Sequence, residues 1–171
     1  MIINLHFLTS LKKNPIPKAR LKKINEILCE NFQQFLNDEF KSEFKFFKKL
    51  ELTIYLAGSN RVKALNSKYR QKNKTTDVLS FPVVDHLIKE VQKEKLPEEF
   101  SLGDIVIDWK VCQKQSKDHQ LEPWLELIYL IHHGFLHLLG FDHEKSKKEE
   151  KMMQEMEDLL FEGIKKKLKV K

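Results

Sequence analysis

The sequence predicts an α+β fold, in which about five helices pack on one mixed sheet of about four strands. Strand-like and helix-like segments alternate along the chain. One helix near the C-terminus is apolar on most sides, which is typical of a helix at the centre of a fold. No repeat or linker divides the 171 residues, a length that suits one domain. We therefore expect a single domain over residues 1–171.

The first three elements follow from hydrophobic patterning. Residues 2–8 favour a strand, because β-branched and other apolar residues are concentrated there. Residues 17–37 carry apolar residues at helical spacing, which predicts an amphipathic helix with a proline near its start. Residues 50–57 alternate between apolar and polar side chains, which predicts a second strand.

A short helix is expected directly after the second strand. Ser59 or Asn60 provides a side-chain oxygen for its N-cap. Val62, Leu65 and Tyr69 have the spacing of a buried stripe. The basic residues of this segment must then face elsewhere.

The middle of the chain predicts two more strands and a short helix. Residues 76–81 favour a third strand that ends at Pro82. Residues 83–101 are polar and rich in charge, which indicates a loop with a helical piece. Residues 103–109 favour a fourth strand, and a short helix should follow it as far as about residue 117.

Two longer helices complete the predicted fold. The histidine-containing helix spans about residues 121–139, and a last amphipathic helix spans residues 147–168. The candidates for the buried side of the last helix are Met152, Met153, Met156, Leu159, Leu160 and Ile164. This methionine-rich stripe is more typical of a core than of a binding surface. The basic residues 165–171 are expected to fray.

Composition limits the possible locations and partners. The net charge of +6 favours a polyanionic partner. Between residues 60 and 74 the chain has no acid and six basic residues: Arg61, Lys63, Lys68, Arg70, Lys72 and Lys74. This run fits either a nucleic-acid surface or a solvated helix face. The sequence has no apolar run long enough for a membrane span and no secretory signal, so we expect a cytoplasmic protein with no membrane partner. Its two cysteines have no metal-binding spacing, and we expect both to be reduced.

Three histidines near the C-terminus have the spacing of a metal site. His133 and His137 are four residues apart, so they lie on one face of a helix. Gly140 can end that helix in the left-handed conformation, after which the chain can turn back and bring in His143. Three protein ligands leave one position of a zinc-type ion open, which is typical of a catalytic site. His132 has no histidine four residues later, so we interpret it as a neighbour and not a ligand.

These histidines place the metal site at the C-terminal end of the central helix. One Zn²⁺ per chain is the expected cofactor, although three histidines also suit nickel or cobalt. The spacing matches the metzincin protease pattern H-E-x-x-H-x-x-G-x-x-H except at Gly134, where those proteases have their glutamate base. The pattern therefore favours metal-activated hydrolysis of a substrate other than a peptide.

Two glutamates lie on the same helical stripe as His133. Glu122 is expected to cap the start of the helix, where an acidic side chain suits the helix dipole. Glu126 lies two turns before His133, and could orient an imidazole or contact substrate. The simpler alternative for Glu126 is also a role at the helix start.

The histidine segment, residues 133–143, resembles the signature of the YbeY family, bacterial metal-dependent endoribonucleases that act in ribosomal RNA maturation. The resemblance covers about residues 50–144 and includes four further blocks: residues 65–70, 76–82 and 102–107, and the pair Glu126-Leu127. The chain departs from the family pattern at Gln71, Asn73, Thr75 and His132, and residues 85–101 lie outside the signature. These departures affect the expected geometry of the loop beside Arg70 but leave the three-histidine pattern intact.

The resemblance implies roles for individual residues. His133, His137 and His143 match the family's metal ligands, and Arg70 matches an arginine that faces the metal pocket and is thought to bind RNA phosphate or stabilise the transition state. Simple chemistry agrees, because arginine binds phosphate through two N–H groups and phosphodiester cleavage needs positive charge where negative charge develops. The ion would activate water or polarise a phosphoryl oxygen.

The first hypothesis for the function is therefore a single-strand-specific, metal-dependent endoribonuclease. The resemblance implies action in maturation of the 3′ end of 16S ribosomal RNA and in ribosome quality control. The expected partners are single-stranded ribosomal RNA and, transiently, ribosomal particles or small-subunit proteins, but not DNA. One alternative is a non-catalytic assembly factor that a metal stabilises and whose basic face binds ribosomal RNA. A metalloprotease-like hydrolase is the other, and Gly134 disfavours it.

Overall fold

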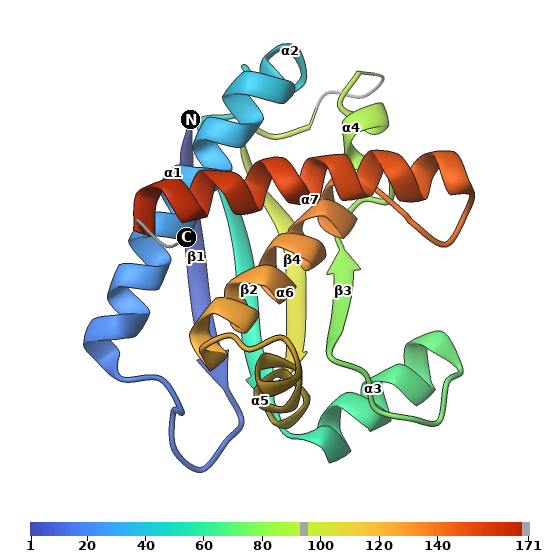
Figure 1. The fold of residues 1–171 in the computed structure, drawn as a ribbon. Helices are drawn as coiled ribbons and strands as arrows, with labels where there is room; N and C mark the ends of the chain where they lie inside the picture. The colour runs from blue at the N-terminus through green and yellow to red at the C-terminus, as the bar shows by residue number, and fades with distance from the viewer. Residues whose placement is uncertain (93–95, 169–171) are drawn as a thin grey trace.

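The computed structural model describes residues 1–92 and 96–168. Along the chain the elements are β1 (Ile2–Thr9), α1 (Lys18–Glu39), α2 (Lys41–Phe44), β2 (Lys49–Ala57), α3 (Ser59–Arg70), β3 (Val78–Pro82), α4 (Leu87–Glu90), β4 (Glu99–Asp108), α5 (Trp109–Asp118), α6 (Pro123–Leu139) and α7 (Lys147–Leu168) (Figure 1). The two additional helices, α2 and α4, have four residues each, too few for a hydrophobic period to be visible in the sequence. One of them, α4, lies in the segment where a helical piece was expected.

The four strands form one mixed sheet in the order β1-β2-β4-β3. β1, β2 and β4 run parallel, whereas β3 pairs antiparallel with β4 at the edge. The predicted α+β fold with a mixed four-stranded sheet is thus confirmed. β3 is thus an edge strand, and several of its residues line a surface cavity.

The fourth strand begins earlier than its composition indicates. Glu99 pairs with Lys49 of β2, and Phe100 is buried, so the loop expected up to residue 101 is already sheet at residue 99. Backbone pairing needs no apolar side chain at each position, and here the exposed Glu99 carboxylate also lies 3.9 Å from the Lys49 ammonium. The first residues of β4 were therefore predicted as loop because their composition is polar.

The histidine helix, α6, is the central helix of the fold, as predicted. It packs against β3, β4, α5 and α7 (Figure 1). On one side, Phe135 stacks on Phe32 of α1 with 3.9 Å between ring centroids. On the sheet side, a Cβ on Gly134 would lie 2.8 Å from Ile105, and the Ser80 hydroxyl donates to the Gly134 carbonyl at 3.2 Å. The glycine therefore lets α6 approach the sheet closely and fixes the face that it turns toward β4.

Helix α3 differs from its prediction at both ends. Its N-cap is Gly58 rather than Ser59 or Asn60, and no side chain caps it. Val62 is buried as expected, but Tyr69 is 55% exposed. The prediction for Tyr69 was wrong because its ring contacts Phe81 of the edge strand β3 and otherwise lines a surface cavity.

Helix α7 buries a narrower face than the sequence predicts. Met153, Leu160 and Ile164 are buried, but Met152 and Leu159 are exposed. The helix lies on the outside of α1 and α6 (Figure 1), so only the side turned toward them is covered. Its basic end is helical up to Leu168 rather than frayed, with Lys165 bonded to Glu162 and Lys167 to Glu30. Residues 169–171, the remainder of the predicted fraying tail, lie outside the described residues.

Within the described ranges, no helix has the length and apolarity that membrane crossing requires. Cys29 and Cys112 are both free thiols, as the absence of a pairing pattern indicated. Burial raises the pKa of the Cys112 thiol to about 12, so this side chain behaves as a small core residue.

Candidate metal centre

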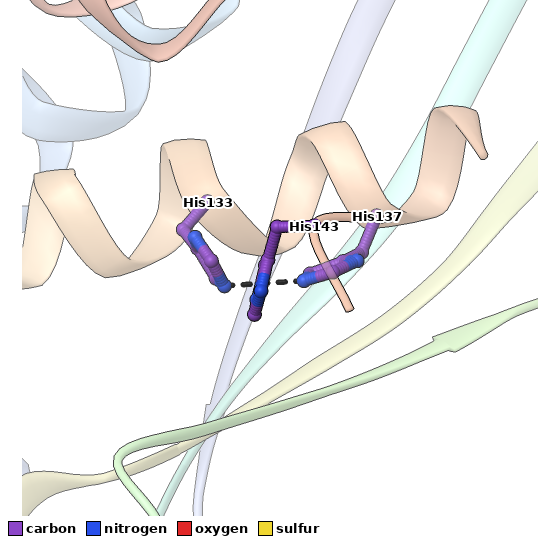
Figure 2. A group of neighbouring side chains, drawn as sticks. All are labelled: His133, His137 and His143. Carbon is purple, nitrogen blue, oxygen red and sulfur yellow. Dashed lines mark hydrogen bonds between the residues drawn. The ribbon is translucent and has the colours of Figure 1, made fainter. Parts of the chain in front are cut away.

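The three predicted histidines come together at one end of α6. His133 and His137 lie on its last two turns, and His143 lies in the loop that leads to α7 (Figure 2). One nitrogen atom of each histidine lies within 4.8 Å of the others. The His143 ring centroid is 5.3 Å from each of the other two rings. Three nitrogen donors therefore converge on a single point.

Gly140 ends α6 and turns the chain back toward the other two histidines. Its φ of 102° lies in the left-handed region that glycine adopts without strain. The Gly140 and Phe141 N–H groups donate to carbonyls in the last turn of the helix. A Cβ on Gly140 would also lie 2.5 Å from the His86 backbone. Both conformation and packing therefore require glycine here, three residues before His143.

Hydrogen bonds on one side of each imidazole orient the two helical histidines. His133 Nδ1 lies 2.6 Å from a Glu157 carboxylate oxygen, and His137 Nδ1 lies 2.9 Å from the Phe141 carbonyl. Both partners are acceptors, so each Nδ1 carries the proton and donates it. Each Nε2 then has a lone pair, and the two Nε2 atoms face each other at 3.1 Å. Two lone pairs at this distance repel unless a cation lies between them.

This geometry fits a divalent metal ion. Two nitrogen ligands of a tetrahedral zinc ion, each about 2.0–2.1 Å from the metal, are about 3.3 Å apart. The 3.1 Å separation of the two Nε2 atoms is close to that value. Burial, together with the neighbouring His133, lowers the pKa of His137 to about 4, so this imidazole is neutral at neutral pH, as a metal ligand must be. The histidine cluster can therefore hold an ion.

The carboxylate beside the cluster is Glu157 of α7, which the sequence pattern did not single out. Its side chain is 7% exposed and also accepts a bond from the Tyr129 hydroxyl at 3.4 Å. Burial and the Glu157 charge raise the Tyr129 pKa to about 12, so that hydroxyl remains a donor. A carboxylate that orients a histidine ligand is a recurrent feature of metal sites. The sequence signal that could have identified Glu157 is its position: it is an acidic residue within the apolar stripe of an amphipathic helix.

Glu126, the acid that the helical stripe favoured, lies elsewhere. It is almost fully buried and bonds to His119 at the end of α5, 2.8 Å from carboxylate oxygen to Nδ1. The suggested contact with the metal site is therefore absent. Glu122 is the N-cap residue of α6, as expected for the helix start, although its side chain makes no capping bond. His132 points into the core beside Asn31, 3.4 Å away, and burial lowers its pKa to about 3, which agrees with its exclusion from the ligand set.

Arg70 and the three histidines line the same cavity, which has a volume of about 740 Å³. The cavity lies between the end of α3, the strand β3 and the end of α6. Arg70 is the last residue of α3, and its Nη2 donates to the Ser80 carbonyl at a long 3.5 Å. Lys72, Lys74 and Lys145 also line the cavity, as do the acids Asp77, Asp85, Asp142 and Glu144. A cationic side chain from one wall thus shares the space with nitrogen donors from the other.

Comparison with known proteins places this fold and site in context. The family model described as "Endoribonuclease YbeY" matches residues 16–165. The protein named "Endoribonuclease YbeY" from Pelagibacter ubique is 42% identical over 131 residues, which are 75% of this chain and 80% of that protein. The protein of the same name from Aquifex aeolicus is 34% identical over 167 residues, with 94% and 93% covered.

A solved structure has the same overall fold. The solution structure of TM1509 from Thermotoga maritima superimposes with a TM-score of 0.58 over 96% of this chain and 91% of that one, at 22% identity. That likeness concerns the fold alone. The family match and the sequence relatives together cover most of the chain, including the three histidines and Arg70. The chain therefore belongs to the YbeY endoribonuclease family.

Proposed function

We propose that this protein is a metal-dependent endoribonuclease that cleaves single-stranded RNA, with residues 1–171 acting as one hydrolase domain. The observation that carries the proposal is the shared cavity: a group suited to phosphate, Arg70, opposes three histidines arranged as metal ligands. The relatives named as endoribonucleases support RNA as the substrate.

His133, His137 and His143 are the proposed ligands, and one Zn²⁺ per chain is the proposed ion. Three neutral imidazoles suit zinc and leave a coordination position open. A bound divalent ion supplies Lewis-acid chemistry, because it lowers the pKa of water and polarises a phosphoryl oxygen. Glu157 keeps the His133 ring in the orientation that turns Nε2 toward the ion position.

Arg70 is the proposed catalytic residue. A guanidinium has five N–H donors, and the single long bond to Ser80 leaves donors for a phosphate. Arg70 would bind the phosphate to be cleaved and stabilise the negative charge that develops on its oxygens. The Ser80 carbonyl would limit where the guanidinium can lie.

Peptide hydrolysis is disfavoured by the packing of Gly134. This position, which holds the base in metzincin-type proteases, turns toward β4, where a Cβ would lie 2.8 Å from Ile105. A glutamate side chain does not fit there.

The proposed biological role is maturation of the 3′ end of 16S ribosomal RNA together with ribosome quality control, in the cytoplasm. The proposed partners are single-stranded ribosomal RNA and, transiently, ribosomal particles or small-subunit proteins. This part rests on the family membership, and the net charge of +6 agrees with a polyanionic partner.

The test of the proposed function is cleavage by zinc-loaded protein of a single-stranded RNA and of a duplex that contains the same strand. We expect the single strand to be cut internally, the duplex to resist, and a chelator to stop cleavage until zinc is restored. Binding without any turnover would instead support the non-catalytic assembly factor. Digestion of casein by the same preparation would instead support the metalloprotease alternative.

Glu157→Gln is expected to weaken zinc binding by about 10- to 100-fold, because the neutral amide holds the His133 N–H less strongly than a carboxylate does. Competition with a zinc-binding dye measures the affinity. The matched control is Glu155→Gln on the same helix, an exposed glutamate beside Lys151 that should bind zinc like the wild type. If Glu157→Gln bound zinc as tightly as Glu155→Gln and the wild type, the role of Glu157 would be contradicted.

A further inference from the structure

Tyr69 is an exposed aromatic side chain at the wall of the candidate active-site cavity. Several large hydrophobic side chains are exposed in the described part of the chain: Ile2, Leu8, Tyr69, Val83, Met152 and Leu159. Among these, Tyr69 is the one aromatic residue and the one that lines the cavity with Arg70 and the three histidines. Single exposed hydrophobic residues are common on protein surfaces, so the distinctive feature of Tyr69 is its position at the cavity wall beside Arg70.

Two neighbours hold the ring without burying it. The Phe81 ring of β3 makes a T-shaped contact with Tyr69, with 5.2 Å between centroids and 71° between planes. The ammonium on the flexible side chain of Lys68 lies over the Tyr69 ring, 4.9 Å from its centroid. These contacts restrict the ring but leave the side chain 55% exposed. A restricted, exposed aromatic ring loses little conformational entropy when another flat group stacks on it.

Basic groups adjoin Tyr69 along the chain, while the cavity wall also carries the acids Asp77, Asp85, Asp142 and Glu144. Arg70 follows it directly, and Lys72 and Lys74 line the same cavity because Gln71, with a φ of 58°, turns the chain at the end of α3. Lys72 lies 3.6 Å from Glu144, but both side chains are more than half exposed, and such pairs contribute little. Exposed aromatics interleaved with basic groups are typical of surfaces that bind single-stranded nucleic acid, where bases stack on the rings and cations follow the backbone.

We propose that Tyr69 is the base-stacking residue of this site: an unpaired RNA base stacks on its ring while the adjoining phosphate lies on Arg70. This inference rests on the proposed function and names how the substrate is selected. In a duplex both faces of a base are already stacked on neighbouring bases, so only an unpaired base can offer a face to Tyr69. The ring beside Arg70 thereby favours single strands.

The experiment measures binding under chelation, so that no cleavage occurs. Two short single-stranded RNAs of equal charge are compared, one complete and one with abasic positions. Base–aromatic stacking predicts that Tyr69→Leu binds the complete RNA at least about fivefold more weakly, with little change for the abasic RNA. Tyr69→Phe keeps the ring and should retain the wild-type preference for the complete RNA. Thermal unfolding verifies that each variant folds, and Tyr69→Gln is a second non-aromatic variant.

The matched control is Tyr55→Leu. Tyr55 also has a cation over its ring, with Arg61 5.4 Å from the centroid, but it does not line the cavity. This control should bind both RNAs with the wild-type ratio. Equal weakening of both RNAs by Tyr69→Leu, or no weakening of either, would overturn the stacking role.

Failure of the proposed function gives a different result. Wild-type protein that prefers the complete RNA through Tyr69, yet cleaves no RNA when loaded with zinc, would refute the nuclease activity and leave the stacking role intact. Wild-type protein that binds neither RNA would overturn both.

Discussion

The His137→Ala variant is expected to lose bound zinc and RNA cleavage together, with the cleavage rate reduced by at least about a hundredfold. His137 contributes one of three converging nitrogen donors, and its Nε2 lies 3.1 Å from that of His133. Two remaining imidazoles bind zinc too weakly to retain it through purification. Metal analysis of protein purified without a histidine tag and a cleavage assay on the same preparation measure both effects.

The control for this variant is His6→Ala. His6 is an exposed histidine on β1, 3.6 Å from Glu51 and far along the chain from the ligand segment. It should retain the zinc content and cleavage rate of the wild type. A His137→Ala preparation that still cleaved RNA, at a rate that a chelator left unchanged, would rule out the metal mechanism.

The Arg70→Ala variant is expected to reduce kcat by about 10²- to 10³-fold while the protein stays folded and loaded with zinc. The guanidinium is exposed and makes one long bond, to the Ser80 carbonyl at 3.5 Å, so its loss should cost less than about 1 kcal/mol of unfolding free energy. Arg70→Lys keeps the charge but cannot bind phosphate in a bidentate manner, so its cleavage rate should lie between those of Arg70→Ala and the wild type. Single-turnover cleavage and thermal unfolding, measured side by side, separate catalysis from stability.

Arg61→Ala is the matched control for Arg70. Arg61 also belongs to α3, but it lies over the Tyr55 ring and does not line the cavity. Its removal should alter cleavage little. If Arg70→Ala lost stability and activity in proportion, or if Arg61→Ala lost as much activity, the catalytic role of Arg70 would be wrong.

The convergence of the three histidines could be predicted from the sequence because its geometry is local. Two histidines four residues apart share a helix face wherever that helix lies, and Gly140 turns the chain within three residues of His143. The central position of α6 followed from its apolar composition. None of these inferences required knowledge of how distant elements pack.

Glu157 could not be predicted in this way. It reaches His133 across the contact between α6 and α7, and residue spacing within one helix does not specify how two helices lie against each other. Glu126 lies on the same face of α6 as His133 but about 10 Å away along the helix axis, because the two are seven residues apart at about 1.5 Å each. There the end of α5 covers it with His119.

The exposure of Tyr69 could not be predicted from residue spacing either, for a different reason. Its spacing from Val62 and Leu65 fits a buried stripe, and Val62 is indeed buried. Whether the last turn of a helix is covered depends on where the sheet beneath it ends. Here the antiparallel strand β3 is the edge, so the final turn of α3 borders the cavity and not the core.

The placement of Glu157 on α7 also determines when the site is completed during protein synthesis. Arg70 and β3 emerge from the ribosome first, the three histidines follow, and the carboxylate that orients His133 is translated fourteen residues after His143. A chain folded only as far as His143 still lacks the partner that orients the His133 ring. The histidine cluster therefore becomes oriented only after α7 has docked on α6.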